Sequence, residues 1–352
     1  MDCRTGDCRW GGGMSVLLIE EVGPATSVQD FGRYGALRYG LGTTGAMDRV
    51  GLACANALVG QDWHAPVIEL GPLPIKIKAK EGTIRLAVSG AMRGISLRGQ
   101  AIAMNESFCL AEGESVMMRA ARGGVFSYLA IEGGMAGAPT FGSFSVHRRA
   151  GLGSPFARPL EAGDQLVVGD ATMQEVEHRL PVLPAVTGPI RCVLGPQDDF
   201  FSPETIARFQ ETEWTISATS DRMGYRLEGP PLAHARTANI VSDGIANGTI
   251  QIPGTGQPLL LLAERGTTGG YPKIATVITA DLGRAAQTPV GAGIRFQAIP
   301  IGEAQALARD LARMIAALPQ RVEKLGGGSL SSEALLAGNL AGHATNALDP
   351  AF

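Results

Sequence analysis

A glycine-rich loop with one lysine is the segment of this sequence best suited to chemistry. Residues 266–273, GTTGGYPK, lie between two apolar, β-rich runs at residues 259–263 and 274–280. Consecutive backbone N–H groups in such a loop can form an anion-binding concavity, and the hydroxyls of Thr267 and Thr268 and the ammonium of Lys273 would lie beside it. The alternative is an ordinary hairpin loop whose glycines supply positive φ angles and whose lysine faces water.

Two nucleotide-binding motifs are excluded by their context. A Walker loop needs a helix after Gly-Lys-Ser/Thr, whereas Lys273 is followed by a β-branched run. The segment GLGTTG at residues 40–45 matches Gly-x-Gly-x-x-Gly, but a dinucleotide fold needs a buried strand directly before it. The polar residues 29–35, QDFGRYG, stand there instead.

A second polar cluster surrounds the glycine-rich turns that precede the first expected helix. Gln29, Asp30, Arg33, Asp48 and Asn56 would place an amide, carboxylates and a guanidinium group at one ligand site. The structural alternative is that Asp48 begins or caps the helix, that Arg33 pairs with Asp30 at the surface, and that Asn56 is exposed.

A third cluster, DRMGYR at residues 221–226, contains Arg222 and Arg226, which either grip an anion or cover one face of a strand. No metal centre is predicted, because the five histidines lack metal-ligand spacing. A biotin attachment site needs a lysine beside methionine. Residues 117–119, MMR, have arginine there, so any biotin would be carried by another protein.

Composition and charge favour a cytoplasmic protein that binds a small molecule or a protein partner. The 352 residues carry a net charge of −3 without a basic stripe, which argues against nucleic acid and anionic membranes. The five cysteines show no Cys-x-x-Cys pair, no apolar run reaches transmembrane length, and residues 1–13 lack the apolar core of a signal peptide.

The pattern of the chain is mostly β, with a few helices. Short strand-like runs follow one another at residues 75–80, 84–90, 95–99, 115–119 and 125–131. Helices are expected at residues 47–59, with Gly60 as a stop, after the capping sequence Ser202-Pro203-Glu204, and at residues 303–318.

Composition also predicts the division into domains. Residues 1–13 form a disordered extension, residues 14–180 an N-terminal β-rich domain, and residues 190–318 a C-terminal domain. The proline-rich residues 180–189, LPVLPAVTGP, link the two, and the Gly-, Ala- and Ser-rich residues 319–352 form a flexible tail.

Long motifs, in order, resemble the allophanate hydrolase subunit 2 family. This family is also called biotin-dependent carboxyltransferase-like or KipA-like, and it includes the C subunit of 5-oxoprolinase. The resemblance covers residues 15–299 and is carried by VGPATSVQDFGRYGALRYGLGTTGAMD, ANALVG, VIELG, YLAIEGG, PLEAGDQL, DRMGYRLEGP and residues 240–287. The chain departs from the family pattern at Phe144, where the family usually has arginine, and at Gly266, where glutamine is common.

The resemblance implies two β-barrel-like domains of the cyclophilin-like fold and a hetero-oligomer. One partner would be a subunit 1 homologue, which is KipI-like and corresponds to the B subunit of 5-oxoprolinase. The other would be a lactam hydrolase, the A subunit. The implied activity is ATP-dependent opening of 5-oxoproline to glutamate. One alternative is carboxyl transfer from carboxybiotin to an amide such as urea, and another is non-catalytic antagonism of a kinase inhibitor.

Both enzymatic alternatives need donors for a developing oxyanion and a positioned base. We predict catalytic roles for Lys273, which would hold an oxyanion, carboxylate or phosphoryl group, and for Asp48 or Asp30, which would orient the amide nitrogen or act as base. The predicted substrate-binding residues are Gln29, Arg33, Asn56, Arg222, Arg226, Gln251, Thr267, Thr268, Gly269, Gly270 and Tyr271.

Overall fold

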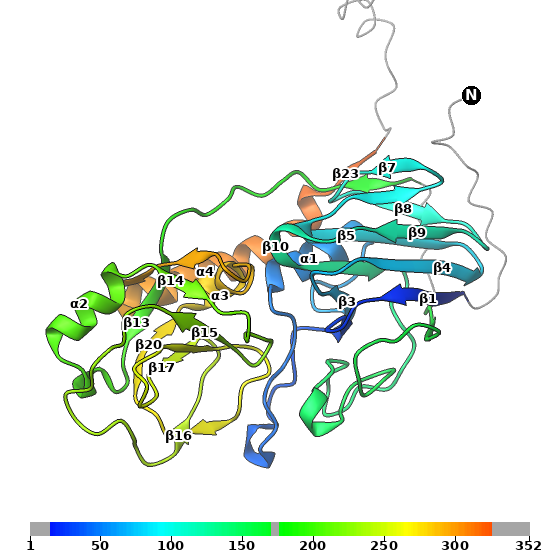
Figure 1. Ribbon diagram of the computed structural model, residues 1–352. Coiled ribbons are helices and arrows are strands. Elements are labelled where there is room, and N and C mark those ends of the chain that lie inside the picture. Colours follow the sequence, from blue (N-terminus) through cyan, green and yellow to red (C-terminus); the bar gives the residue numbers. More distant parts are fainter. Residues whose placement is uncertain (1–14, 170–175, 326–352) are drawn as a thin grey trace, which may run out of the picture.

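The computed structural model describes residues 15–169 and 176–325, which form two β-rich lobes (Figure 1). The first lobe contains two antiparallel sheets. The six-stranded sheet has the order β11 (Gln165–Val167), β1 (Val16–Val22), β4 (Ile75–Glu81), β9 (Ser115–Met118), β6 (Ile95–Leu97) and β7 (Gln100–Ile102). The five-stranded sheet has the order β2 (Ser27–Gln29), β3 (Val67–Leu70), β10 (Arg122–Ile131), β5 (Ile84–Met92) and β8 (Ser107–Leu110).

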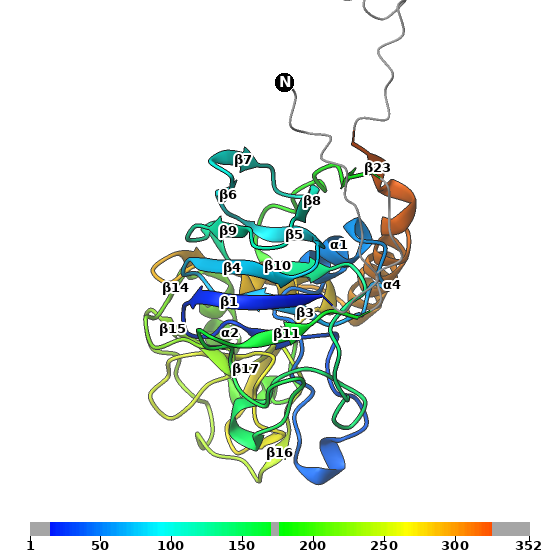
Figure 2. The same cartoon turned by 90° about the vertical axis from the view of Figure 1, so that its right-hand side faces the viewer.

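The alternating sequence of β4 explains how the two sheets of this lobe pack against each other. Ile75, Ile77 and Ala79 are buried, whereas the lysines between them are partly exposed. The buried face packs in one apolar core with Leu17 and Val88, which come from the two sheets. Figure 2 shows β1, β4 and β9 side by side in the six-stranded sheet.

The second lobe is built on one sheet that curls into a nearly closed barrel. Its order is β21 (Gly293–Ile294), β14 (Trp214–Ile216), β15 (Gly224–Glu228), β18 (Leu259–Leu261), β17 (Thr249–Gln251), β20 (Lys273–Val277), β13 (Ile190–Leu194) and β22 (Phe296–Ala298). Only Arg295 separates β21 from β22, yet they lie at opposite ends of this order. The two edges of the sheet must therefore approach each other.

Two short strand pairs and several helices complete the described chain. The strand pairs are β12 (His178–Arg179) with β23 (Glu323–Lys324), and β16 (Asp243–Gly244) with β19 (Thr268–Gly269). The α-helices are α1 (Arg49–Leu58), α2 (Pro203–Glu211), α3 (Leu282–Ala286) and α4 (Ile301–Ala316). The 3-10 helices are η1 (Leu37–Tyr39), η2 (Arg148–Ala150), η3 (Asp198–Phe200), η4 (Thr279–Asp281) and η5 (Leu318–Arg321).

Helix α1 joins the two lobes. Its buried residues, such as Leu52 and Leu58, belong to one apolar core that also includes Ile274 and Ile315 of the second lobe. The helix ends as its sequence predicts, because Gly60 follows its cap with a φ of 69°. Residues 180–189 arch between the lobes without helix or strand (Figure 1).

The mostly β prediction with few helices is confirmed, and so are the five early strands and three predicted helices. Helix α3 was not predicted. The hairpin alternative for residues 266–273 is wrong, because β17 lies between β18 and β20. The predicted extension 1–13 and residues 326–352 of the predicted tail lie outside the described residues.

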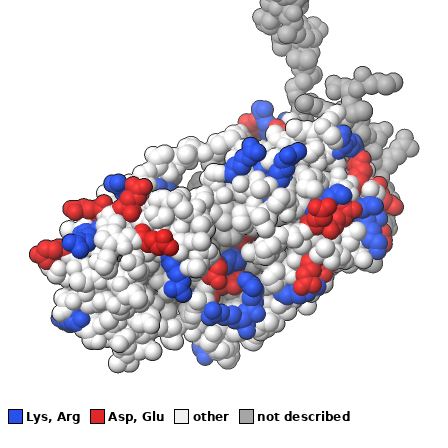
Figure 3. Space-filling view, viewed as in Figure 1, with Lys and Arg blue, Asp and Glu red and all other residues white. Residues whose placement is uncertain are grey.

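No helix in the described part of the chain is long and apolar enough to cross a membrane. On the face shown in Figure 3, basic and acidic side chains are interspersed.

Candidate functional site

A large cavity of about 1400 Å³ lies where the two lobes meet. Its walls come from the start of α1, the end of β5, the linker, α3 and α4. Much of the wall is apolar, including Leu183, Leu311 and Ile315. Asp48, Asn247 and Gln287 also line it, together with other polar side chains of which five are arginines, so a polar ligand would meet several orienting groups.

Asp48 caps helix α1 and also lines this cavity. Its Oδ1 accepts hydrogen bonds from the amides of Val50 (3.0 Å) and Gly51 (3.2 Å), so it caps α1 as the structural alternative predicts. Its Oδ2 accepts one from Nε2 of Gln287 at 3.0 Å. The side chain is half-buried and lines the cavity. The carboxylate is thereby held at the positive end of a helix, facing the ligand space.

Gln287, just after α3, was missed from the sequence because a single glutamine carries no motif. Its Oε1 accepts from the amides of Val125 and Phe126, each at 2.9 Å, and its Nε2 donates to the Phe126 carbonyl at 2.8 Å. This one side chain therefore fixes α3 of the second lobe to β10 of the first and orients Asp48.

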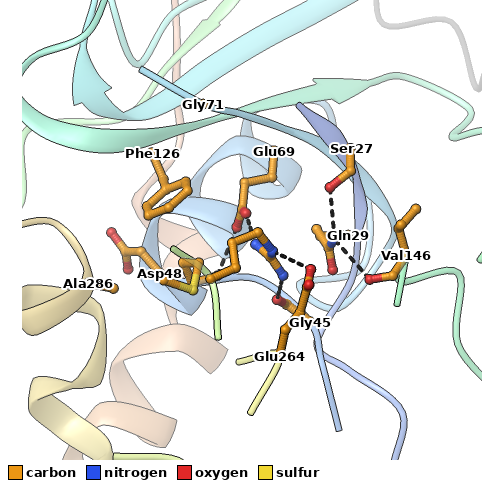
Figure 4. Close-up of polar contacts among 12 residues, drawn as sticks. Ser27, Gln29, Gly45, Asp48, Glu69, Gly71, Phe126, Val146, Glu264 and Ala286 are labelled. Carbon is orange, nitrogen blue, oxygen red and sulfur yellow. Dashed lines mark hydrogen bonds and ion pairs between the residues drawn. The ribbon is translucent and has the colours of Figure 1, made fainter. Parts of the chain in front are cut away.

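A buried network of polar contacts lies near Asp48 and includes Glu69, Glu264 and the Gly45 carbonyl (Figure 4). The Asp48 amide donates to the Tyr128 hydroxyl at 2.6 Å, and that hydroxyl donates to Oε2 of Glu69 at 3.0 Å. Arg222 forms an ion pair with Glu69, donates through Nε to Glu264 at 2.7 Å, and donates to the Gly45 carbonyl at 2.7 Å. Burial raises the pKa of Tyr128 well above its usual range, so the phenol stays protonated.

The two arginines of the third sequence cluster lie in different surroundings. Arg222 is buried, and its partners are carboxylates and a carbonyl of this chain. Arg226 on β15 is exposed. The structure does not bring the two guanidinium groups together on one ligand.

Asp30 and Arg33 hold loops together. Asp30 accepts from the amides of Gly32 (2.8 Å) and Phe144 (2.7 Å) and from the hydroxyls of Ser143 (2.7 Å) and Ser145. Arg33 is fully buried rather than paired with Asp30 at the surface, and donates to the carbonyls of Thr140 and Ser145, each at 2.9 Å. Phe144, the departure from the family pattern, packs against the core of the first lobe.

The two predicted amides, Gln29 and Asn56, are also buried. Asn56 donates to the Ala65 carbonyl at 2.9 Å, so the alternative that it is exposed is wrong. Gln29 donates to the Ser27 hydroxyl at 2.9 Å and to the Val146 carbonyl at 3.4 Å, while its Oε1 is buried without a partner (Figure 4).

Lys273 lies away from the residues that line the cavity. The first residue of β20, it is only 2% exposed, and its Nζ donates to Asp243 at 2.6 Å and to Gln197 at 3.2 Å. The hydrogen bond from Lys273 lowers the pKa of Asp243. These partners occupy the ammonium group that the sequence offers for an oxyanion.

The loop before Lys273 is pinned by strand pairing rather than curled around a ligand space. Thr268 and Gly269 form β19, the Thr267 carbonyl accepts from the Ile245 amide at 3.0 Å, and Tyr271 is 41% exposed. None of its glycines has a positive φ. Gly269 is needed for space, because a Cβ there would lie 2.7 Å from Nε2 of Gln251. The catalytic and binding roles of these residues stay predictions.

Comparisons with known proteins place this architecture in a family. Residues 39–298 match the family model described as carboxyltransferase domain, subdomain A and B. The C subunit of the Haemophilus influenzae 5-oxoprolinase is 33% identical over 294 residues, covering 84% of this chain and 94% of that protein. Its Escherichia coli counterpart, also named as the C subunit of 5-oxoprolinase, is 33% identical over 309 residues, covering 87% and 99%.

Among solved structures, the K. lactis urea amidolyase superposes with a TM-score of 0.79 at 26% identity. The match covers 86% of this chain and 20% of that longer chain. With a family model that spans most of the sequence and relatives covered almost end to end, this chain belongs to the carboxyltransferase subdomain A and B family.

Proposed function

We propose that this chain is the C subunit of an ATP-dependent 5-oxoprolinase, a hydrolase complex that opens 5-oxoproline to glutamate. Two relatives named as this component of 5-oxoprolinase match nearly their whole length, which supports this function over a domain borrowed from a larger enzyme. The proposal includes two partners, a KipI-like B subunit and a lactam hydrolase as the A subunit. It also includes ATP consumed by the complex and a cytoplasmic location.

The geometry that carries the proposal is Asp48 at the cavity between the lobes. A lactam is stabilised by resonance, so its opening is helped by a group that binds the N–H and orients the ring for attack at the carbonyl carbon. Asp48 is a half-buried carboxylate held by two helix amides and by Gln287, and it needs no rearrangement to face a bound amide. Asn247 lines the same cavity and offers an amide side chain to the ligand.

The test is reconstitution of the complex with the purified full-length chain and its partner subunits. The proposal expects no ATP hydrolysis by this chain alone and 5-oxoproline-dependent ATP hydrolysis when every component is present. Urea in place of 5-oxoproline should give no turnover. Absence of 5-oxoproline-dependent turnover from a complex that assembles stoichiometrically would overturn the proposal.

The close superposition on urea amidolyase supports a second candidate, a biotin-dependent carboxyltransferase. That function would need a biotin carrier and a biotin carboxylase on other chains. Its signature is carboxylation of urea or another amide that depends on bicarbonate, ATP and the biotinylated carrier. Addition of avidin would abolish this activity and leave 5-oxoprolinase turnover unchanged, so one set of assays separates the two candidates.

A further inference from the structure

A buried glycine-rich loop next to the cavity has backbone donors without acceptors. Gly42, Thr43, Thr44 and Gly45 are all buried, and none of their amides donates a hydrogen bond to another described residue. Buried N–H groups are almost always paired in folded proteins, because an unpaired one costs free energy. The backbone is also strained here, since Thr44 has a φ of 51°.

Two buried guanidinium groups converge on this loop from opposite lobes. Nη1 of Arg33 donates to Oγ1 of Thr44, and Nη1 of Arg265 donates to Oγ1 of Thr43, each at 3.2 Å. Arg33 is fully buried and Arg265 is 5% exposed. Within the described residues neither forms a salt bridge, although Asp30 lies close enough to Arg33 to interact with it.

The charge on Arg265 is costly in this position. Burial, together with the neighbouring cation of Arg49, lowers the pKa of Arg265 to about 10. The group is still protonated at neutral pH. A buried cation whose remaining contacts are neutral, such as the Ile245 carbonyl at 3.1 Å, leaves room for an anion to stabilise it.

His147 is a third side chain that lies next to this loop, after Arg33 and Arg265. It is 8% exposed, its Nδ1 is buried without a hydrogen-bond partner, and its Nε2 would lie 3.7 Å from a Cβ placed on Gly42. Burial lowers the pKa of His147, with Glu264 opposing and Arg33 adding to the shift, so the ring is neutral at pH 7 and retains one N–H donor. Glu264 itself is bound to Arg222.

We propose that the loop at residues 42–45, with Arg265 and His147, binds a small planar oxyanion of the carboxylate or carbonate type. Unpaired amides, an unbalanced buried guanidinium group and an unpartnered imidazole supply complementary donors for such a group. Identifying the ligand as the carboxylate of 5-oxoproline rests on the proposed function. A carbonate-type group held before its transfer would present the same oxyanion to the site and is the alternative ligand.

The test measures binding to the purified full-length chain by calorimetry, without partners or ATP. The ligands are 5-oxoproline, 2-pyrrolidone, which has the lactam but no carboxylate, and bicarbonate. The variant is Gly42→Ala. The φ of Gly42 is not in the left-handed region, and the added methyl group would press on the Arg265 carbonyl oxygen at 3.0 Å and face Nε2 of His147 at 3.7 Å. Gly302→Ala, with no atom near the added methyl group, is the matched control.

If the carboxylate of 5-oxoproline is the ligand, it binds at least about tenfold more tightly than 2-pyrrolidone, and Gly42→Ala removes most of that difference. Bicarbonate binding that is lost in Gly42→Ala, with 5-oxoproline no tighter than 2-pyrrolidone, supports the site with carbonate as its ligand. Binding of neither anion at roughly 10 mM, or binding unchanged by Gly42→Ala, overturns the proposal.

A second measurement keeps the proposal testable if Gly42→Ala fails to fold. Nitrogen chemical shifts of the His147 ring in the wild-type chain should move on addition of the bound anion, and the other histidines serve as internal references. Saturable binding without movement of the His147 resonance would place the ligand elsewhere. Because no turnover is needed, failure here is distinct from failure of the 5-oxoprolinase proposal.

Discussion

At the residue scale, buried polar side chains divide into those that only hold loops and those that also face the cavity. Arg93 belongs to the first kind. It is 5% exposed and donates to the Ser127 hydroxyl and to backbone carbonyls of Leu73 and Arg119. Burial lowers its pKa to about 10. Asp48 differs, because it caps a helix and still lines the cavity.

Lys273 is the residue for which sequence and geometry lead to different expectations. Its ammonium group is bound to Asp243 and Gln197, and its stem is buried. We therefore expect Lys273→Met in the reconstituted complex to keep kcat within about threefold, since methionine preserves the packing of the stem and Asp243 is exposed to water. A loss of about a hundredfold with an unchanged melting temperature would restore the catalytic role predicted from the sequence.

The sequence was informative for residue types and less so for their partners. Asp48 was predicted both as a cap and as a site residue, and its position next to a helix start made that possible. Glu69, Glu264, Arg265 and Gln287 were not predicted, because the fold brings each to partners distant in the sequence. Three of them reach across the two lobes, whereas Glu264 pairs with Arg222 within the second lobe. Pairings such as Gln287 with Asp48, 239 residues apart, leave no local pattern to detect.

At the element scale, Asp281 joins β13 to the start of α3. Its carboxylate is fully buried and accepts from the Arg191 amide at 2.8 Å, from the Arg191 side chain at 2.7 and 2.9 Å, and from Arg284 at 2.9 Å. Burial alone would raise the pKa of Asp281, but the hydrogen bonds and charges of the two arginines outweigh it. The pKa is lowered from its ordinary 3.8.

This shift predicts how stability depends on pH. With a folded-state pKa below the unfolded value, Asp281 stabilises the fold above about pH 4 and loses that effect as the pH falls through the folded-state pKa. Asp281→Asn should therefore be less stable than wild type at about pH 6, and the gap in urea midpoint should narrow at about pH 3. A gap that stays constant across this range would contradict the assignment.

Elements whose capping and turn signals lie within their own sequence could be predicted. Helix α2 has Ser202 as its cap, accepting from the Thr205 amide at 3.2 Å, with a proline in the first turn, as its sequence predicts. Helix α3 spans five residues, LGRAA, which is too short for an amphipathic period to appear. The position of β17 between β18 and β20 depends on pairing between distant strands, which periodicity does not encode.

At the scale of the whole molecule, Arg222 forms an ion pair that connects the two lobes of the described chain. It links Glu69 of β3 in the first lobe with Glu264 of the second. Arg222→Met should destabilise the chain by about 3–5 kcal/mol, because it leaves two buried carboxylates without their counter-charge. Urea unfolding of the purified chain measures this loss.

A double-mutant cycle tests that explanation. Combining Arg222→Met with Glu264→Gln removes one of the two unpaired charges, so the double variant should be more stable to urea than the sum of the single losses predicts. Asp310→Asn, on the exposed face of α4, is a control that should leave the urea midpoint unchanged within error. Simple additivity of the two single losses would show that the carboxylates are not coupled through Arg222.

We expect the carboxylate of Asp48, at the cavity between the lobes, to take part in the chemistry of the complex. Asp48→Asn tests it most directly, because asparagine also caps helices well and removes only the charge. The measurement is 5-oxoproline-dependent ATP hydrolysis by the reconstituted complex. We predict a kcat lower by about a hundredfold or more with the melting temperature within about 2 °C of wild type, and an unchanged kcat would contradict the account.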